Sequence, residues 1–382
     1  MPEDTVTAQT TSPVPQSTPA AVTSSPKKGG SKLPLLAILA LVVVVIVGVG
    51  AYFALSLTGG KTVAQTTATQ GKLCTGMKIV YFAGGNAGEP VPSVITNGVK
   101  QAQSDLGPNI EYVYSGWLTD KMALQFKDAI AEKPDAIAMM GHPGSDIMGP
   151  LIDEAERKGI IVTLQNVDLQ DIRTKYIANG FGYAGADLYK FGLGLSQGLV
   201  RKFGLKSGDE GVVLLAAALG PNGVSTGRAL MGQGDYDGLK QAGLTVHTEL
   251  IPDAVNNTPD SPAGDAFIKS ILAKYPKVKV IIDDHGELTA AMGPILKRLG
   301  VKPGEYIVGG YDLSPKTVTD IQEGYVAMVK DQELYLEGYL PILQVCLAKK
   351  YQFSGLYIDT GVGLVDSTNV NQIVNLVKDQ IR

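Results

Sequence analysis

Short apolar runs alternate with amphipathic stretches along most of the chain, starting at Met77. Many of these runs are apolar throughout and do not alternate with polar residues, which is typical of parallel strands covered on both faces. The stretches between them show helical spacing and end near Gly or Pro. The predicted strands are 78–83, 110–114, 136–140, 160–164, 176–178, 212–217, 278–283 and 306–310, and the predicted helices include 92–106, 120–132, 147–158, 263–275, 287–299 and 334–348.

This alternation predicts an α/β fold of parallel sheets joined by right-handed crossovers. About 300 residues of such units suit either one barrel or two doubly wound lobes. A glycine-rich break at 178–185, after the fifth predicted strand, favours two lobes. In two such lobes a ligand binds at the carboxyl ends of the strands.

A different pattern precedes this α/β region, which is called the module below. Residues 33–57 carry no charged side chain and are long enough for a helix to cross a hydrocarbon core of about 30 Å. Lys27, Lys28 and Lys32 stand just before this run, so the positive-inside rule places the module after it outside the cell. The prediction is a retained single-pass transmembrane helix, and a cleaved secretory signal is the alternative.

The segments on either side are polar. Residues 1–32 are rich in Thr, Ser and Pro and are expected to form a disordered cytoplasmic tail, and residues 58–76 are expected to form a linker. The net charge of −4 disfavours nucleic-acid binding. Two cysteines exclude a four-cysteine metal site, and three histidines leave little room for a histidine-rich one.

Five motifs follow one another in the order found in a known family: 142–147 (HPGSDI), 153–163 (DEAERKGIIVT), 280–286 (VIIDDHG), 307–314 (IVGGYDLS) and 332–338 (QELYLEG). Through them the chain resembles the periplasmic sugar-binding proteins of the ribose-binding type. The resemblance implies one small ligand between two lobes joined by a three-strand hinge, and delivery of that ligand to an ABC permease.

The hinge sets the expected lobe boundaries. The resemblance implies chain crossings near 178–180, 330–333 and 356–361. Lobe 1 is then expected to hold 77–179 plus 333–357, and lobe 2 to hold 180–332 plus 358–382.

The resemblance also implies ligand contacts from loops at the strand ends and from the hinge. These side chains suit a hydroxyl-rich ligand because carboxylates accept hydrogen bonds and amides both donate and accept them. The expected contacts are Asn86, Glu89, Gln165, Asn166, Asp284, Asp312 and Gln332. For Asp312 a helix-capping role is the alternative, and for Gln332 an ordinary hinge role.

Two further residues are candidates. Trp117, the only Trp, follows the second predicted strand and can either stack on a sugar face or pack in the core. Asp235 stands where the family usually has an Arg, and the only Arg nearby is Arg228. Together with Glu89, Asp284 and Asp312, Asp235 would make the cleft acidic, which hints at an amine-bearing ligand.

The two cysteines are expected to form a disulfide. Cys74 precedes the first strand, and Cys346 lies late in the helix predicted at 334–348. Helices that start at the cleft end at the opposite edge of the sheet, where the first strand begins. Both sulfur atoms are therefore predicted to meet at the base of lobe 1.

The predicted function is non-enzymatic: a monomer captures a small hydroxylated ligand, most simply a monosaccharide, for an ABC importer, without a cofactor. His285 beside Asp283 and Asp284 is a poor metal trio, because three adjacent positions do not easily face one ion. A ligand-binding sensor, a binder of a nucleoside or amine, and an α/β enzyme are the alternatives. No nucleophile–base pattern supports the enzyme.

Overall fold

Two separate six-stranded sheets organise the part of the chain that the computed structural model describes, residues 71–221, 225 and 227–382. These residues belong to one compact unit, Gln70–Arg382. The predicted cytoplasmic tail, the predicted transmembrane helix at 33–57 and most of the linker lie outside the described residues. Within them, no helix combines the length and apolarity that a membrane crossing requires.

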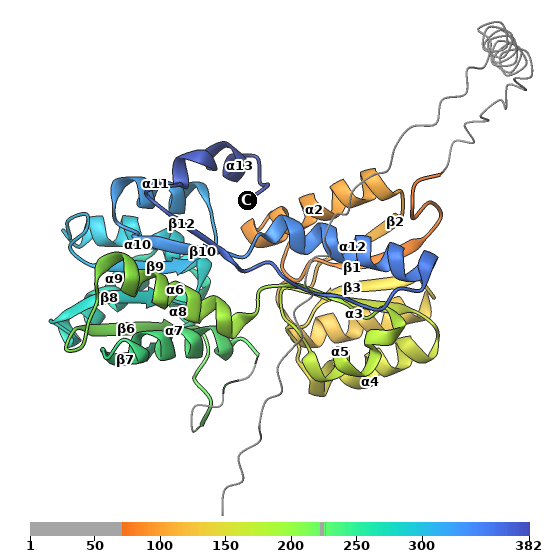
Figure 1. The fold of residues 1–382 in the computed structure, drawn as a ribbon, viewed down its shortest axis with the longest axis horizontal. Coiled ribbons are helices and arrows are strands. Elements are labelled where there is room, and N and C mark those ends of the chain that lie inside the picture. The colour runs from red at the N-terminus through yellow and green to blue at the C-terminus, as the bar shows by residue number, and fades with distance from the viewer. Residues whose placement is uncertain (1–70, 222–224, 226) are drawn as a thin grey trace, which may run out of the picture. The chain divides into compact units, whose positions relative to one another are not determined.

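The first sheet is parallel throughout, with the strand order β11-β5-β4-β3-β1-β2. Figure 1 shows helices on both of its faces. Its strands are β1 Lys78–Phe82, β2 Asn109–Val113, β3 Ala136–Met140, β4 Ile161–Gln165, β5 Tyr183–Gly185 and β11 Tyr357–Asp359, and its helices are α2 Pro90–Leu106, α3 Thr119–Ala131, α4 Ser145–Arg157, α5 Gln170–Tyr176 and α12 Leu334–Tyr351, with the 3₁₀ turn η1 Ile177–Asn179.

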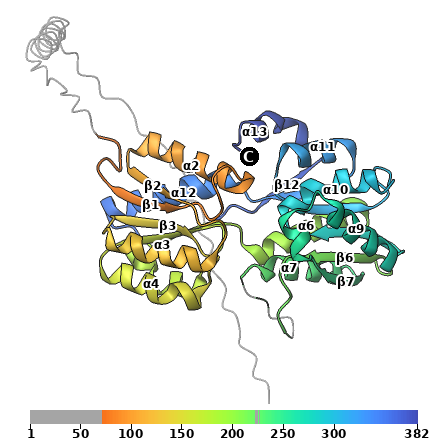
Figure 2. The same cartoon turned by 180° about the vertical axis from the view of Figure 1, so that it is seen from behind.

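The second sheet has the order β12-β10-β9-β8-β6-β7, and only the β10–β12 pair is antiparallel. Figure 2 shows this lobe from the opposite side. Its strands are β6 Glu210–Leu215, β7 Thr245–Leu250, β8 Val278–Asp283, β9 Ile307–Tyr311, β10 Met328–Asp331 and β12 Gly363–Asp366, and its helices are α6 Leu188–Phe203, α7 Ala229–Gln241, α8 Asp253–Asn257, α9 Pro262–Lys274, α10 Gly286–Arg298, α11 Pro315–Glu323 and α13 Val374–Lys378, with the 3₁₀ turn η3 Val370–Gln372.

Helices cover both faces of each sheet, which explains why central strands such as β3 and β4 are buried along almost their whole length. In β1, Ile79 and Tyr81 belong to a cluster with α2 and α12, whereas Val80 and Phe82 belong to a cluster with α3 and α4. All four side chains are at most 1% exposed. The expected α/β fold with two doubly wound lobes is therefore confirmed. Among the described residues, the hydrophobic clusters begin at Leu73 and fill both lobes of the compact unit.

The crossings between the sheets differ in part from the predicted ones. Tyr183 of β5 pairs with Tyr357 of β11 inside the first sheet, so the first crossing comes after Gly185 and not near 178–180. The second crossing lies between β10 and α12, as expected, and the third lies between β11 and β12. The end of the glycine-rich stretch thus forms β5, a strand of the first sheet, and is not the crossing itself.

The prediction of a strand at 176–178 is wrong. These residues form the end of α5 and the turn η1, and the fifth strand begins at Tyr183. Ile177 is 38% exposed, whereas Phe181 and Tyr183 are fully buried. The later segment joins the sheet because its side chains are buried. Its glycines lower its strand propensity, so the sequence pattern did not predict a strand there.

Candidate functional site

The candidate site lies at the carboxyl ends of the strands of both sheets. Loops from several parallel strands meet at this edge, so residues far apart in the sequence come together there. The structure brings most of the predicted ligand residues to these loops and to the second crossing. It gives two of them, Gln165 and Asp235, positions inside a lobe.

Three of the predicted residues form one cluster above β1 and β2. One carboxylate oxygen of Glu89 accepts hydrogen bonds from the Asn86 backbone N (2.9 Å) and from Trp117 Nε1 (2.8 Å). Its other oxygen accepts a bond from Asn86 Nδ2 (2.6 Å). Glu89 thus fixes the indole ring of Trp117, which stays 37% exposed. The ring can therefore stack on a ligand without leaving its place.

Trp117 also packs beside His142, with 5.2 Å between ring centroids. Burial lowers the pKa of His142 to about 4, and the positive charge of Arg228 adds to the lowering. His142 belongs to lobe 1 and Arg228 to lobe 2, so their charges interact across the two lobes. His142 Nδ1 is buried and finds no hydrogen-bond partner within the described part of the chain.

A row of hydrogen bonds joins the two lobes through the hinge. Asn166, just after β4, donates from Nδ2 to Gln332 Oε1 (3.1 Å). Gln332 in turn donates from Nε2 to Asp312 Oδ1 (2.5 Å), at the end of β9. Burial raises the pKa of Asp312 to about 7, against the opposing effect of the Gln332 bond. Both Asn166 (φ 62°) and Asp312 (φ 62°) adopt left-handed backbone conformations, which turn their side chains out of the strand direction.

Asp284, at the end of β8, is fully buried. Its Oδ1 accepts a bond from the Ala216 backbone N (2.6 Å), and its backbone oxygen accepts one from Arg228 Nη2 (2.8 Å). Burial raises the pKa of Asp284 to about 6, although the charge of Arg228 opposes this. Asp284 Oδ2 and Arg228 Nε have no partner among the residues described.

Arg228 is the site residue that sequence reasoning missed. Its charge acts on the pKa values of His142, Asp284, His285 and Asp312, so it lies among them. It precedes α7 directly, which begins at Ala229. The sequence did offer a signal, because Arg228 is the only Arg near the place where the related family usually has one. The motif spacing, however, placed Asp235 there.

Asp235 lies inside lobe 2 and is fully buried. Its Oδ2 accepts a hydrogen bond from the Tyr311 hydroxyl (2.7 Å). Burial raises the pKa of Asp235 well above its usual range. Its partner is thus a core tyrosine, its Oδ1 has no partner among the described residues, and ligand contact by Asp235 stays a prediction.

Gln165 is also fully buried. It donates from Nε2 to the Phe82 backbone oxygen (3.0 Å), which ties the end of β4 to the end of β1. Its Oε1 lacks a partner in the described residues. Ligand contact by Gln165 stays a prediction.

Two cavities flank these residues. One, of about 50 Å³, contains Asp312 in its wall and is lined by Pro90, Val91, Gly286, Glu287, Ala290, Asp312, Leu313, Ser314 and Thr317. The other, of about 260 Å³, is lined by Val167, Asp168, Gln170, Arg173, Ala186, Asp187, Leu188, Gly227, Leu230 and Tyr357. The larger one contains no predicted ligand residue but adjoins Asn166 and Arg228 in sequence. Four residues at these strand ends, His142, Arg228, Asp284 and His285, carry buried polar atoms without a partner among the described residues.

Histidines and carboxylates do not form a metal site in the described residues, where no group of three potential ligands lies close enough to hold an ion. His285 Nε2 instead lies 3.1 Å from Glu287 Oε2. The arrangement therefore supports hydrogen-bonded capture of a polar ligand.

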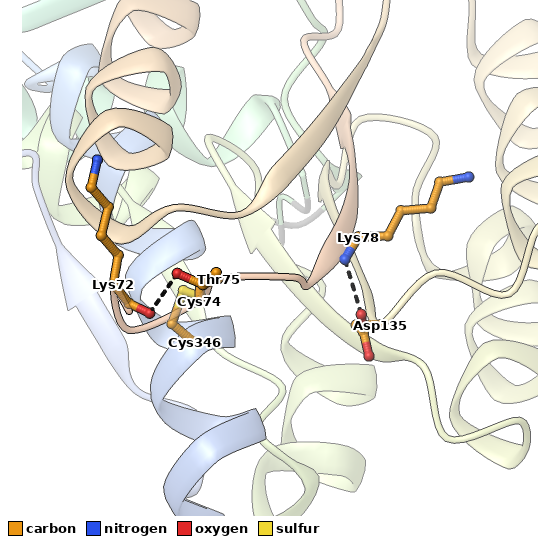
Figure 3. Close-up of a disulfide and its surroundings, with 6 residues drawn as sticks. All are labelled: Lys72, Cys74, Thr75, Lys78, Asp135 and Cys346. Carbon is orange, nitrogen blue, oxygen red and sulfur yellow. Dashed lines mark hydrogen bonds between the residues drawn. A yellow bond between two sulfur atoms is a disulfide. The ribbon is translucent and has the colours of Figure 1, made fainter. Parts of the chain in front are cut away.

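At the other end of lobe 1, Cys74 and Cys346 form a disulfide, with 5.4 Å between their Cα atoms. This is the pair proposed from the sequence. Figure 3 shows it beside the start of β1, where Lys78 N donates to Asp135 Oδ2 (2.9 Å). Both cysteines are at most 1% exposed. The bond joins the segment before β1 to the second half of α12.

Two lobes of this topology, with polar side chains converging at the strand ends and hinge, define a two-lobe ligand-binding protein. The family described as "periplasmic binding protein domain" matches residues 80–350. The chain belongs to this family, which is one of binding proteins and not of enzymes.

Solved structures share the fold. A carbohydrate transporter from Acidothermus cellulolyticus 11B, in complex with myo-inositol, superposes with a TM-score of 0.65 at 19% identity, over 80% of this chain and 99% of that one. A solute-binding protein of an ABC transporter from Burkholderia graminis C4D1M, in complex with D-arabinose, gives a TM-score of 0.64 at 19% identity, over 78% and 97%.

A curated relative matches part of the chain. The xylose/arabinose-binding protein XylF of Sulfolobus acidocaldarius is 34% identical over 112 residues, which is 27% of this chain and 27% of that protein. The match thus spans about a quarter of either protein.

Proposed function

We propose that this protein is an extracytoplasmic sugar-binding protein, which captures a monosaccharide between its lobes and presents it to an ABC importer. The main support is the row of hydrogen bonds Asn166–Gln332–Asp312, which crosses from one lobe to the other, together with the partly exposed Trp117, which Glu89 holds in place after β2. Planar carboxylate and amide groups with a nearby aromatic ring suit a hydroxylated ring with one apolar face. The relatives that bind xylose, arabinose or myo-inositol point to ligands of this class.

The charges at the site favour a neutral ligand. Arg228 lies among the carboxyl groups of Asp284 and Asp312, whose pKa values are raised to about 6 and about 7 by burial. Near neutral pH the site therefore carries less negative charge than its residue types suggest. Sugar hydroxyls can donate to Asp284 Oδ2 and accept from Arg228 Nε, the two unpartnered atoms, without adding a charge.

A ligand screen tests the proposal. Residues 70–382, which form one compact unit, would be heated with D-xylose, D-arabinose, myo-inositol, D-glucosamine and adenosine in turn. A ligand of micromolar affinity at millimolar concentration stabilises the folded state by about 4 kcal/mol, a clear rise in Tm. We expect one of the neutral sugars or the polyol to raise the Tm in this way. The second candidate function is binding of an amine or a nucleoside, which the carboxylates of Glu89, Asp284 and Asp312 suggest. Stabilisation by glucosamine or adenosine alone would favour it.

We also propose that residues 33–57 form a retained transmembrane anchor with the binding module outside. The support is their uninterrupted apolar sequence and the three lysines just before it. Anchoring holds the binding protein at high effective concentration near its permease.

A further inference from the structure

A buried carboxyl group lies directly behind the ligand-facing residues of the hinge. Glu337, in the first turn of α12, is fully buried. Its Oε2 accepts a hydrogen bond from Asn166 Nδ2 (3.0 Å), and its Oε1 is bonded to the Thr360 hydroxyl (3.3 Å). Asn166 comes from the end of β4, and Thr360 from the third crossing. Glu337 thus joins one ligand-facing side chain to the hinge.

Within the described residues, no Lys or Arg forms an ion pair with Glu337. A buried carboxylate without a cation is costly, and the group responds by holding its proton. Burial, followed by the charge of Asp312, raises the pKa of Glu337 well above its usual range, although the bonds from Asn166 and Thr360 act in the opposite direction. A neutral acid keeps Oε2 as an acceptor for Asn166 and places its proton on Oε1, toward Thr360.

The direction of these bonds decides which atom of Asn166 faces the ligand. In its ionised form Asp312 can only accept, so Gln332 donates to it from Nε2 and turns its Oε1 toward Asn166. Asn166 Nδ2 therefore has two acceptors, Gln332 Oε1 and Glu337 Oε2, and both of its protons are used. The atom left for a ligand is Asn166 Oδ1, an acceptor.

We propose that Glu337 acts as a neutral carboxylic acid that positions Asn166, so that Asn166 and the ionised form of Asp312 together offer only acceptors to the ligand. It selects ligands that donate two hydrogen bonds on this side, as neighbouring sugar hydroxyls do. This inference rests on the proposed sugar-binding function. Glu337 itself does not contact the ligand.

A matched pair of variants tests this role. Gln344 lies two turns further along the same helix and is 5% exposed. It accepts from the Leu356 backbone N (2.9 Å) and donates to the Tyr183 backbone oxygen (3.4 Å), without touching Asn166, Gln332 or Asp312. Glu337→Leu and Gln344→Leu both remove a buried polar group from α12, so both should lower the Tm of the ligand-free protein.

Calorimetric titration of the full-length chain in detergent with D-arabinose and with myo-inositol separates the two. We expect Glu337→Leu to raise the Kd for the bound probe tenfold or more, and Gln344→Leu to leave it within about twofold. Glu337→Gln should keep wild-type affinity, because an amide accepts from Asn166 and donates to Thr360 as the neutral acid does. A Gln variant as weak as the Leu variant, or equal losses in both Leu variants, would overturn the proposal.

A second measurement does not depend on a sugar. The side-chain amide of Asn166 gives a ¹H–¹⁵N signal pair, identified by its loss in Asn166→Ala of residues 70–382. We expect this pair to shift in Glu337→Leu and to keep its position in Gln344→Leu. An unshifted pair in Glu337→Leu rejects the positioning role. A wild-type protein that binds none of D-xylose, D-arabinose and myo-inositol rejects the proposed function instead, and the amide signals still decide the role of Glu337.

Discussion

At the scale of single residues, hydrogen-bond partners separate ligand-facing groups from structural ones of the same type. Asp312 bonds to the hinge residue Gln332, whereas Asp235 bonds to the core hydroxyl of Tyr311. Sequence motifs placed Asp312 at a strand end correctly but could not distinguish Asp235 from Arg228 as the cleft residue. Asp235 follows Arg228 by seven residues, about two helical turns, so the two positions share a helix face but lie about 10 Å apart along its axis, and motif spacing does not resolve that shift.

Asp312 gives the most direct test of where the ligand binds. Asp312→Ala removes an acceptor and releases Gln332, so we expect the Kd for the sugar to rise at least tenfold. The matched control is Asp168→Ala, which lies in the wall of the larger cavity and pairs with Arg173. Calorimetry should show little change for the control. The opposite ranking would place the sugar in the larger cavity.

The buried carboxyl groups predict how stability depends on pH. Burial raises the pKa values of Asp283, Asp284 and Asp312 to about 8, 6 and 7, from about 3.9 in the unfolded chain. Between these limits the folded state binds more protons than the unfolded state, so its stability falls as the pH rises from about 4 to about 8. Thermal melts of the ligand-free protein should show this decline.

Asp312→Asn should flatten that decline between about pH 4 and pH 7, since an amide does not titrate. Asp366→Asn serves as the control. The pKa of Asp366 is lowered despite its burial, through hydrogen bonds from Lys202 and Thr368, so its contribution lies at lower pH. Equal slopes in wild type and Asp312→Asn would contradict the assignment.

At the scale of elements, the sequence predicts long buried strands well and short ones poorly. The strand predicted at 278–283 coincides with β8, and the helix predicted at 120–132 differs from α3 by one residue at each end. In contrast β11, with three residues, and β12, with four, are too short to show a period of two. These two strands form only by pairing with β5 and β10, which are distant in the sequence and become neighbours on folding.

The disulfide is the strongest constraint on α12. It closes a loop with a sequence separation of 272 residues, so reduction should lower the free energy of unfolding by about 2–4 kcal/mol. Thiol labelling of unfolded protein should find no free thiol before reduction and two after it. Cys74→Ala/Cys346→Ala, unlike the wild type, should melt at the same temperature with and without a reductant. Two free thiols before reduction would contradict the pairing.

At the scale of the whole molecule, the two sheets exchange chain at three crossings, and the candidate site lies where these crossings meet the strand ends. The alternation of strands and helices predicts two such sheets, and the family match accounts for their order. The ligand's identity does not follow from the sequence in the same way. It depends on the direction of individual hydrogen bonds, such as those that orient Asn166.

The proposed anchor is tested on the full chain. Membranes from expressing cells would be washed with alkaline carbonate, which removes peripheral proteins. We expect the full chain to stay in the membrane fraction and a variant lacking residues 1–60 to be released. Both should bind the same sugar with equal affinity, because the core belongs to residues from Leu73 onward. Release of the full chain, with a shortened N-terminus, would show that the apolar run is a cleaved signal.

The bond between Cys74 and Cys346 also determines how mechanical load enters the molecule. A force that pulls on the chain from its N-terminal side reaches Cys74 before it reaches β1. The covalent bond passes that force into α12, which packs on the sheet with α2. The hydrogen bonds of β1 to β2 and β3 are therefore not the first to bear the load. Load from the N-terminal side would therefore be carried first by the covalent bond at Cys346, in the second half of α12, and only then by the first turn of α12, which holds Glu337.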